Sequence, residues 1–159
     1  MIISQKETEI NPCYVSELLN PLSLASAMEN NVLDLVNYSD SSQCAMVVVH
    51  LVKPTFERVD EPTKQEIRKA LRCLVENSDL ASKWIGDKLL LCGVAPESFD
   101  LFLREMWMML FSIDGSVDYY AKIFKIKNKP LGSNKFVFIS PPVESLQQRI
   151  DRLREMLIR

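Results

Sequence analysis

The stretch VAPESFDLFLREMWMMLFSI, residues 94–113, is the segment on which the expected fold depends. Pro96 suits the first position of a helix, where its missing N–H would have no partner, and Asp100 places negative charge in the first turn. Apolar residues then recur three and four positions apart, the spacing of a buried helical face: Phe99, Phe102, Leu103, Met106, Met109, Leu110 and Ile113. The sequence therefore predicts a central helix from Pro96 to Ile113.

The opposite side of this helix is expected to begin polar and to end apolar. At 100° per residue, its stripe consists of Asp100, Arg104, Met108 and Phe111, with Trp107 on the flank. A membrane span is excluded, because about 20 apolar residues are needed and two charged residues interrupt this segment. Either another part of the chain covers this second face, or a partner binds there, as polarizable methionines beside a tryptophan favour. These five residues are the candidate partner-binding site.

The composition is typical of a soluble globular protein. Of the 159 residues 47% are apolar and 25% are charged, and a chain of this length can form one domain, residues 1–159, with a sizeable core. Four glycines are few for a sheet-rich fold or for a glycine-lined phosphate loop. The apolar run at the start is too short for a signal peptide, so we expect a cytoplasmic protein.

The residue types that support catalysis or metal binding are scarce. The four cysteines, at positions 13, 44, 73 and 92, form no C-x-x-C pair, which predicts reduced, buried thiols. His50 is the single histidine, and nothing in the sequence places a nucleophile beside it. No Walker loop or dinucleotide fingerprint is present. We therefore expect no catalytic residue, no metal site and no cofactor.

Charge is distributed unevenly along the chain, although the net charge is only −2. Residues 1–118 contain 18 acidic and 10 basic residues, a balance of −8. Residues 119–159 contain 9 basic and 3 acidic residues, a balance of +6. Such polarity bears on the choice of a partner rather than on the fold.

Two further helices are expected directly before the central one. Residues 60–76 begin at Asp60 and combine an apolar face with solvated charges, and residues 80–92 follow a capping segment and end at Gly93. Short links between the three helices favour packing side by side. Shorter helices are predicted between Asn11 and Tyr38.

The run from Cys44 to Val52 is ambiguous between a helix and a strand. Its three consecutive valines favour a strand, whereas Cys44, Val47 and Leu51 lie on one helical face. We favour a helix, because no strand of matching quality lies nearby, and we expect Pro54 to end it.

The sequence changes character after residue 118. Aromatic and β-branched residues on both sides of a loop rich in Pro, Gly and Asn predict a β-hairpin over residues 119–140. A final helix is expected over residues 143–159, with a narrow heptad seam at Val143, Leu146, Ile150, Leu153 and Leu157. This helix is too short to be stable alone. It either docks on the second face of the central helix or pairs, through Val143–Leu157, with a second copy of the chain.

The expected hairpin is basic and contains no acidic residue. Its lysines are Lys122, Lys125, Lys127, Lys129 and Lys135, which alternate with aromatic residues. Such a mixture can bind phosphates and stack bases, although lysine lacks the bidentate contacts by which arginine reads bases. These lysines are the candidate nucleic-acid-binding residues, and lysines that guard a sheet edge are the structural alternative.

The sequence thus predicts a mainly α, single-domain helical bundle with a small C-terminal β-hairpin. The expected function, reached by elimination, is that of a non-catalytic cytoplasmic protein-binding module, such as an inhibitor, an immunity-type protein or an adaptor. The alternative is a nucleic-acid-associated regulator that uses the basic hairpin.

Overall fold

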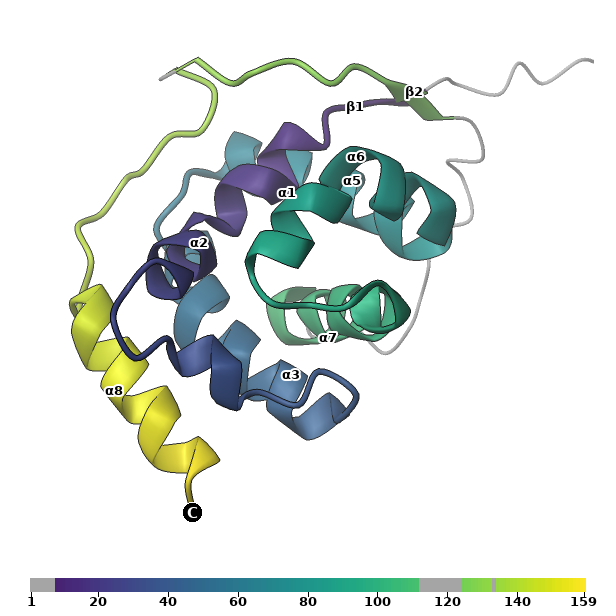
Figure 1. Ribbon diagram of the computed structural model, residues 1–159. Coiled ribbons are helices and arrows are strands. Elements are labelled where there is room, and N and C mark those ends of the chain that lie inside the picture. Colours follow the sequence, from purple (N-terminus) through teal and green to yellow (C-terminus); the bar gives the residue numbers. More distant parts are fainter. Residues whose placement is uncertain (1–7, 112–123, 133) are drawn as a thin grey trace, which may run out of the picture.

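The computed structural model describes residues 8–111, 124–132 and 134–159 of the chain. These residues are mainly helical, with a two-stranded sheet at one end of the molecule (Figure 1). The α-helices are α1 (Cys13–Leu18), α2 (Asn20–Ser26), α3 (Ser41–Val47), α4 (Lys53–Glu57), α5 (Glu61–Glu76), α6 (Ser78–Leu91), α7 (Phe99–Phe111) and α8 (Leu146–Leu157). The other elements are β1 (Thr8–Ile10), η1 (Val32–Leu35), η2 (Val48–Val52), η3 (Pro96–Ser98) and β2 (Phe124–Ile126). No described helix is both long and apolar enough to cross a membrane.

The ambiguous run at 44–52 is helical. Together α3, η2 and α4 form one continuous helical segment, in which η2 is a π-helical turn. Pro54 has no N–H to donate to the carbonyl four residues before it, and a wide turn at this point accommodates that gap. The helix therefore passes through Pro54 rather than ending there, and it continues to Glu57.

The predicted helices at 60–76 and 80–92 are confirmed as α5 and α6. The Asp60 carboxylate accepts a hydrogen bond from the Thr63 N–H and caps α5. Gly93, with φ of +85°, follows α6, and the Val94 N–H donates to the Leu89 carbonyl 3.0 Å away. This is a Schellman motif, whose left-handed residue favours glycine.

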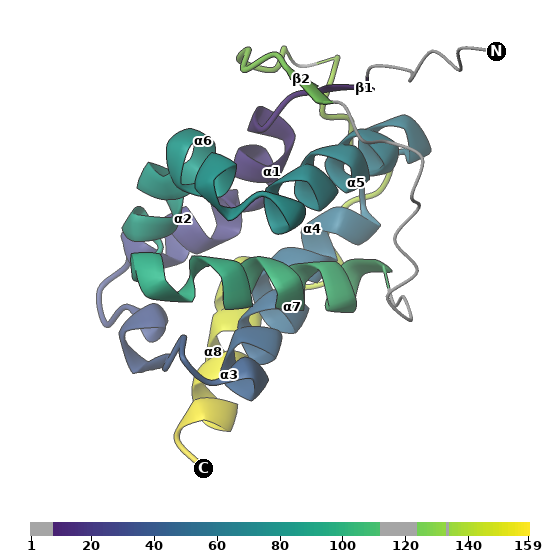
Figure 2. The same cartoon turned by 90° about the vertical axis from the view of Figure 1, so that its right-hand side faces the viewer.

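The central helix is confirmed as η3 followed by α7, although the predicted end at Ile113 lies outside the described residues. Figure 2 shows α7 crossing the molecule between α5 and α6 on one side and α3 on the other. Its buried residues are Phe99, Phe102, Leu103, Met106, Trp107 and Leu110. They belong to a hydrophobic cluster that takes in side chains from α1 to α8.

The predicted C-terminal β-hairpin over residues 119–140 is not confirmed, and residues 119–123 and 133 of that range lie outside the described residues. β2 pairs in parallel with β1, so that Thr8 lies opposite Phe124 and Ile10 opposite Ile126. Phe138 instead forms an isolated antiparallel bridge with Val59. Each of these pairings joins segments that are far apart in the sequence, which the local pattern of strand and turn residues did not reveal.

Residues 127–132 and 134–145, here called the strap, connect β2 to α8. The strap runs along the outside of the helices (Figure 1), and hydrogen bonds hold it at several points. The Asp60 N–H donates to the Val137 carbonyl at 2.9 Å, and the Ile139 N–H donates to the Arg58 carbonyl at 2.7 Å. The strap is therefore attached to the start of α5 before it reaches α8.

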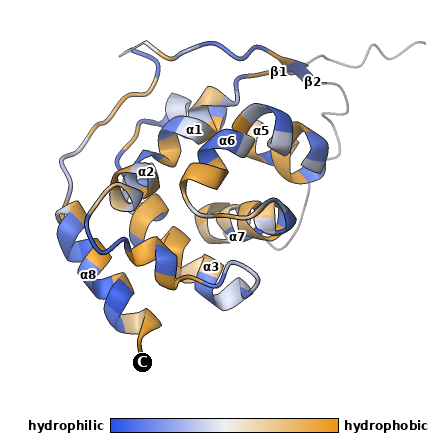
Figure 3. Ribbon diagram, in the orientation of Figure 1, coloured by the Kyte–Doolittle hydropathy of each residue, from blue (hydrophilic) through white to orange (hydrophobic). Residues whose placement is uncertain are grey.

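The predicted final helix is present as α8, although Val143 lies before it and is 98% exposed. Ser145 and Gln148 form a capping box at its start. Figure 3 shows polar and apolar residues alternating along α8, as a narrow apolar seam requires. Ile150 and Leu153 are buried, and the main contacts of α8 are with η1, η2, α2 and α3. The expectation that this helix covers the second face of the central helix is therefore wrong.

Candidate functional site

The five residues of the predicted partner-binding stripe on α7 are not equally accessible. Arg104 is exposed and forms an ion pair at 3.2 Å with the partly exposed Asp100, and Met108 is 47% exposed. Trp107, by contrast, is only 8% exposed, and Phe111 is partly buried. Three of the five residues thus remain on the surface of α7.

The covering of Trp107 and Phe111 comes from α4 and α5. The Arg68 guanidinium of α5 lies 5.8 Å from the centre of each ring, and the rings of Trp107 and Phe111 are 4.8 Å apart. Phe56 of α4 meets Phe111 edge-on at 5.2 Å. Most of the apolar surplus that the sequence indicated around the central helix is therefore covered within the chain.

The predicted nucleic-acid-binding lysines do not lie on a hairpin. Lys122 lies outside the described residues, and Lys125 is exposed on β2. Lys127, Lys129 and Lys135 line a cavity of about 750 Å³ between the strap, α1 and α5.

Carboxylates line the same cavity as these lysines. Glu9 pairs with Lys127 at 3.1 Å, and Asp60 and Glu66 also line the cavity. Carboxylates in the same cavity as the lysines lower the positive potential that a nucleic-acid backbone would meet.

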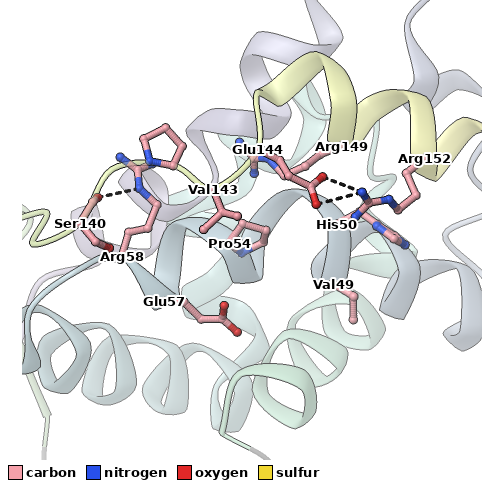
Figure 4. A pocket seen from close by; sticks show the side chains of 11 residues that line it. Val49, His50, Pro54, Glu57, Arg58, Ser140, Val143, Glu144, Arg149 and Arg152 are labelled. Atoms are coloured by element: carbon pink, nitrogen blue, oxygen red, sulfur yellow. Dashed lines mark hydrogen bonds and ion pairs between the residues drawn. The ribbon is translucent and has the colours of Figure 1, made fainter.

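A different group of charged residues surrounds a cavity of about 410 Å³, here called the arginine pocket. It lies between η2 and α4 on one side and the end of the strap and α8 on the other (Figure 4). Its lining residues are Val49, His50, Pro54, Glu57, Arg58, Ser140, Pro142, Val143, Glu144, Arg149 and Arg152. The volume falls within the usual range for small-ligand sites in proteins.

Arg149 is the least exposed charged residue of this pocket. Its side chain is 9% exposed, and its Nε and Nη1 atoms have no hydrogen-bond partner among the described residues. Burial, and then the nearby Arg58 cation, lowers the pKa of the Arg149 guanidinium, although the Glu144 carboxylate acts in the opposite direction. Arginine nevertheless stays charged in proteins near neutral pH, so the pocket contains a buried cation.

The other two arginines already have partners. The Arg152 guanidinium contacts both carboxylate oxygens of Glu144, at 2.8 and 2.9 Å. Arg58 donates from Nε to the Ser140 carbonyl at 3.0 Å, and its guanidinium lies 4.5 Å from the centre of the Phe138 ring. Figure 4 shows both sets of contacts at the edges of the pocket.

His50 adds no positive charge to the pocket at neutral pH. Its Nε2 atom lies 3.0 Å from the Met156 sulfur. Burial, and then the Arg152 cation, lowers the pKa of His50 below its ordinary value of 6.5, although Glu144 acts in the opposite direction. The imidazole is therefore neutral at pH 7.

Apolar residues border the pocket on the solvent side. Val143 is 98% exposed and Val49 is 40% exposed, and Pro54 and Pro142 also line the cavity. We call these four residues the apolar rim. A buried cation beside exposed apolar side chains is the arrangement typical of a binding site.

The sequence patterns pointed to none of the arginines of this pocket. Arg149 lies three residues after Leu146 and four before Leu153, so it directly adjoins the apolar seam of α8. Charged residues are common beside a narrow apolar seam, so this position gave no signal of burial. The partners from η2, α4 and the strap, in turn, come from segments whose proximity depends on the tertiary fold.

The cysteines are free thiols, and three of them, Cys44, Cys73 and Cys92, are buried. Within residues 8–111, 124–132 and 134–159, no group of His, Cys, Asp and Glu side chains is arranged to hold a metal ion. No protein family model matches the chain, and neither does a curated protein or a solved structure.

Proposed function

We propose that the protein is a non-catalytic protein-binding module, of the inhibitor or adaptor type, whose partner docks on the arginine pocket and its apolar rim. The observation that supports this proposal is the near-complete exposure of Val143 beside the buried Arg149. Val143 does not stand alone, because Val49 and two prolines lie on the rim of the same cavity, and exposed apolar residues that gather at one place mark interaction sites.

The residue types around the pocket are those of protein interfaces. Arginine is enriched in interfaces, and binding energy is concentrated in a few residues that fill or line a central pocket. Val143 and Val49 stand on opposite walls of the pocket, one on the strap and one on η2. A partner that bridges both walls would bury both side chains together.

A capture experiment with matched variants tests the docking surface. Val49→Ser combined with Val143→Ser removes the exposed apolar part of the rim. The control combines Leu90→Ser with Leu91→Ser on α6, where both residues are more than half exposed and lie outside the pocket. We expect one protein to be recovered from cells that make the chain by the wild type and the control, but not by the rim variant.

Purified components then make the result quantitative. We expect the rim variant to bind the recovered protein at least about tenfold more weakly, since each 1.4 kcal/mol changes affinity tenfold. Equal affinity of wild type and rim variant would show that the partner does not dock on the rim.

The outer stripe of α7 is the competing surface for a partner. A triple variant, Asp100→Ala, Arg104→Ala and Met108→Ala, removes its exposed residues. Loss of binding in this variant alone would assign docking to α7 and would overturn the assignment to the arginine pocket.

A further inference from the structure

We propose that the arginine pocket is a site for a phosphate monoester, held by the guanidinium groups of Arg149 and Arg58. This inference rests on the proposed function, because it names the chemical group by which a partner is anchored. It assigns a ligand class to a cavity rather than a surface, so it can be tested separately from partner docking.

The unpaired atoms of Arg149 are the first reason to expect an anion. Buried polar groups in folded proteins nearly always have hydrogen-bond partners, and a buried charge without a counter-ion is costly. Arg149 has two nitrogen atoms, Nε and Nη1, without partners among the described residues. An anion in the pocket would compensate the charge of this guanidinium, which lines the cavity.

The balance of charge in the pocket favours a dianion. Arg152 is compensated by Glu144, whereas Arg149 and Arg58 form no ion pair with any described residue. Glu57 also lines the pocket, but in Figure 4 its carboxylate extends away from the arginines. The three arginines thus exceed the one carboxylate beside them, Glu144, by two positive charges, since His50 is neutral.

A phosphate monoester matches two cations better than a carboxylate or a phosphodiester does. It has a charge between −1.5 and −2 near pH 7 and offers three acceptor oxygens. A carboxylate or a diester has one negative charge and would leave one of the two guanidinium groups uncompensated. Arginine is also the residue that binds phosphate with directed, charge-assisted hydrogen bonds.

The shape of the site fits a phosphate that is attached to a larger group. The cavity of about 410 Å³ is larger than one phosphoryl group requires, and its outer wall is the apolar rim. The carbon atoms that bear the phosphate would lie against Pro54, Pro142 and Val143. Both a phosphorylated side chain of a partner and a free phosphorylated metabolite have this chemistry.

Calorimetric titration and thermal unfolding with defined probes test the proposal. The probes are inorganic phosphate, phenyl phosphate, a short alanine peptide that contains phosphoserine, and the same peptide with glutamate in place of phosphoserine. Ionic strength is kept equal with chloride. We expect the three phosphate probes to raise the melting temperature in a concentration-dependent way, as a ligand of the folded state must.

Two arginine variants and one control locate the binding. Arg149→Gln and Arg58→Gln should each weaken binding of phenyl phosphate by about tenfold or more, because each removes charge-assisted hydrogen bonds. Arg104→Gln, at an exposed and ion-paired position on α7, should leave binding unchanged. Arg149→Gln also removes an unpaired buried charge, so without ligand this variant should melt no lower than the wild type.

Comparison of the probes distinguishes the two sources of the phosphate. The phosphate belongs to a partner protein if the phosphoserine peptide binds more tightly than inorganic phosphate and if this difference in affinity is lost in Val143→Ser. Equal binding of phenyl phosphate and the phosphopeptide identifies a free phosphate ester. Binding of the glutamate peptide as tightly as the phosphopeptide would overturn the assignment, as would an equal response of Arg149→Gln and wild type.

The inference and the proposed function can fail separately. If partner capture is lost in the rim variant but survives phosphatase treatment of the extract, and phenyl phosphate does not bind, the proposed function is preserved and the phosphate site is overturned. If phenyl phosphate binds in a way that depends on Arg149, but the wild type and the rim variant capture the same proteins, the phosphate site is preserved and the proposed function is overturned.

Discussion

Tyr38 connects two parts of the core through a single hydroxyl group. It is buried, its OH donates to the Cys92 carbonyl at 3.0 Å, and its ring meets Phe102 edge-on at 5.6 Å. Tyr38→Phe keeps the ring but leaves that buried carbonyl without its partner. We expect a loss of about 1–2 kcal/mol in the free energy of unfolding, measured by urea denaturation.

Tyr14→Phe is the matched control for this change. Tyr14 is also buried, but its hydroxyl has no hydrogen bond to a described residue. A loss in Tyr14→Phe as large as that in Tyr38→Phe would contradict the assignment of the effect to the hydrogen bond with Cys92.

Cys73 makes the stability of the protein sensitive to alkaline pH. Burial, and then the charge of Glu76, raises the pKa of this thiol from 9.0 to about 11. Between these values the unfolded chain loses a proton that the folded chain keeps, so stability falls as the pH rises. We expect the fall in the urea midpoint from pH 9 to pH 11 to be smaller in Cys73→Ala.

Cys13→Ala provides the comparison, because this thiol is only partly buried. Cys13→Ala should change the fall in the urea midpoint from pH 9 to pH 11 less than Cys73→Ala does. Equal changes in the two variants would contradict a dominant effect of burial on the pKa of Cys73.

At the scale of elements, the start of α5 depends on the Asp60 carboxylate. Hydrogen bonds from the side chain and the backbone N–H of Thr63 lower the pKa of Asp60 below 3.8. The stabilisation from this cap is complete above that pH and is lost as the pH falls below it. We expect Asp60→Ala to lower the urea midpoint at pH 7 and to flatten the loss of stability in acid.

Asp60→Asn distinguishes the hydrogen bond of the cap from the protonation of the Asp60 carboxyl group. Asparagine caps helices about as well as aspartate but has no carboxyl group to protonate. This variant should therefore be nearly as stable as wild type at pH 7, and it should also show the flatter acid dependence. A steep acid loss that persists in Asp60→Asn would assign that loss to other carboxylates.

The burial of Leu153 in α8 distinguishes docking within the chain from pairing with a second copy. Leu153 is fully buried against the rest of its own chain. We expect Leu153→Ala to lower the free energy of unfolding by about 2–5 kcal/mol. Because the contact is intramolecular, the loss should be the same at low and high protein concentration, as measured by thermal unfolding over a wide concentration range.

A dependence of this loss on protein concentration would contradict the intramolecular contact and would support self-association through Val143–Leu157. Val143→Ser serves as the control, since this side chain is almost fully exposed and its replacement should leave the stability unchanged.

The helices could be predicted from the sequence because their signals are local. α5 combines a 3-and-4 apolar spacing with a cap at Asp60, and α6 ends at a glycine with positive φ. The pairing of β1 with β2 has no local signal, since Thr8 and Phe124 come from distant parts of the chain. Residues 124–126 and 136–138 both have strand-like composition, but each pairs with a different segment.

The candidate sites could not be predicted fully for the same reason, because local sequence patterns do not show which distant segments lie together. Trp107 belongs to an apolar surplus that the sequence indicated, yet Arg68 from another helix covers it. The arginine pocket combines residues of η2, α4, the strap and α8. Arg149 lies beside the seam of α8, where charged residues are common, so its place in the sequence does not mark it as part of a site made from four segments.

At the scale of the whole molecule, stability is expected to be uneven. α5 and α7 lie within the hydrophobic cluster, whereas most residues of the strap are exposed. Local opening is easiest where few apolar side chains are buried. We expect hydrogen exchange measured by mass spectrometry to be slowest in α5 and α7 and fastest in the strap.

Saturating phenyl phosphate provides an internal comparison in the same measurement. Binding in the arginine pocket should slow exchange at residues 140–145 and at the start of α8, and leave α6 unchanged. Exchange in the strap that is as slow as in α7 without any ligand would contradict the uneven distribution of stability.

The parallel pairing of β1 with β2 has a consequence for the order of events on the ribosome. β1 is made first but must wait, unpaired, until residues 124–126 have emerged, while the helices between them can already fold against one another. The walls of the arginine pocket that come from the strap and α8 are made later still. A nascent chain can therefore bury most of its helical core before the walls of the arginine pocket are complete.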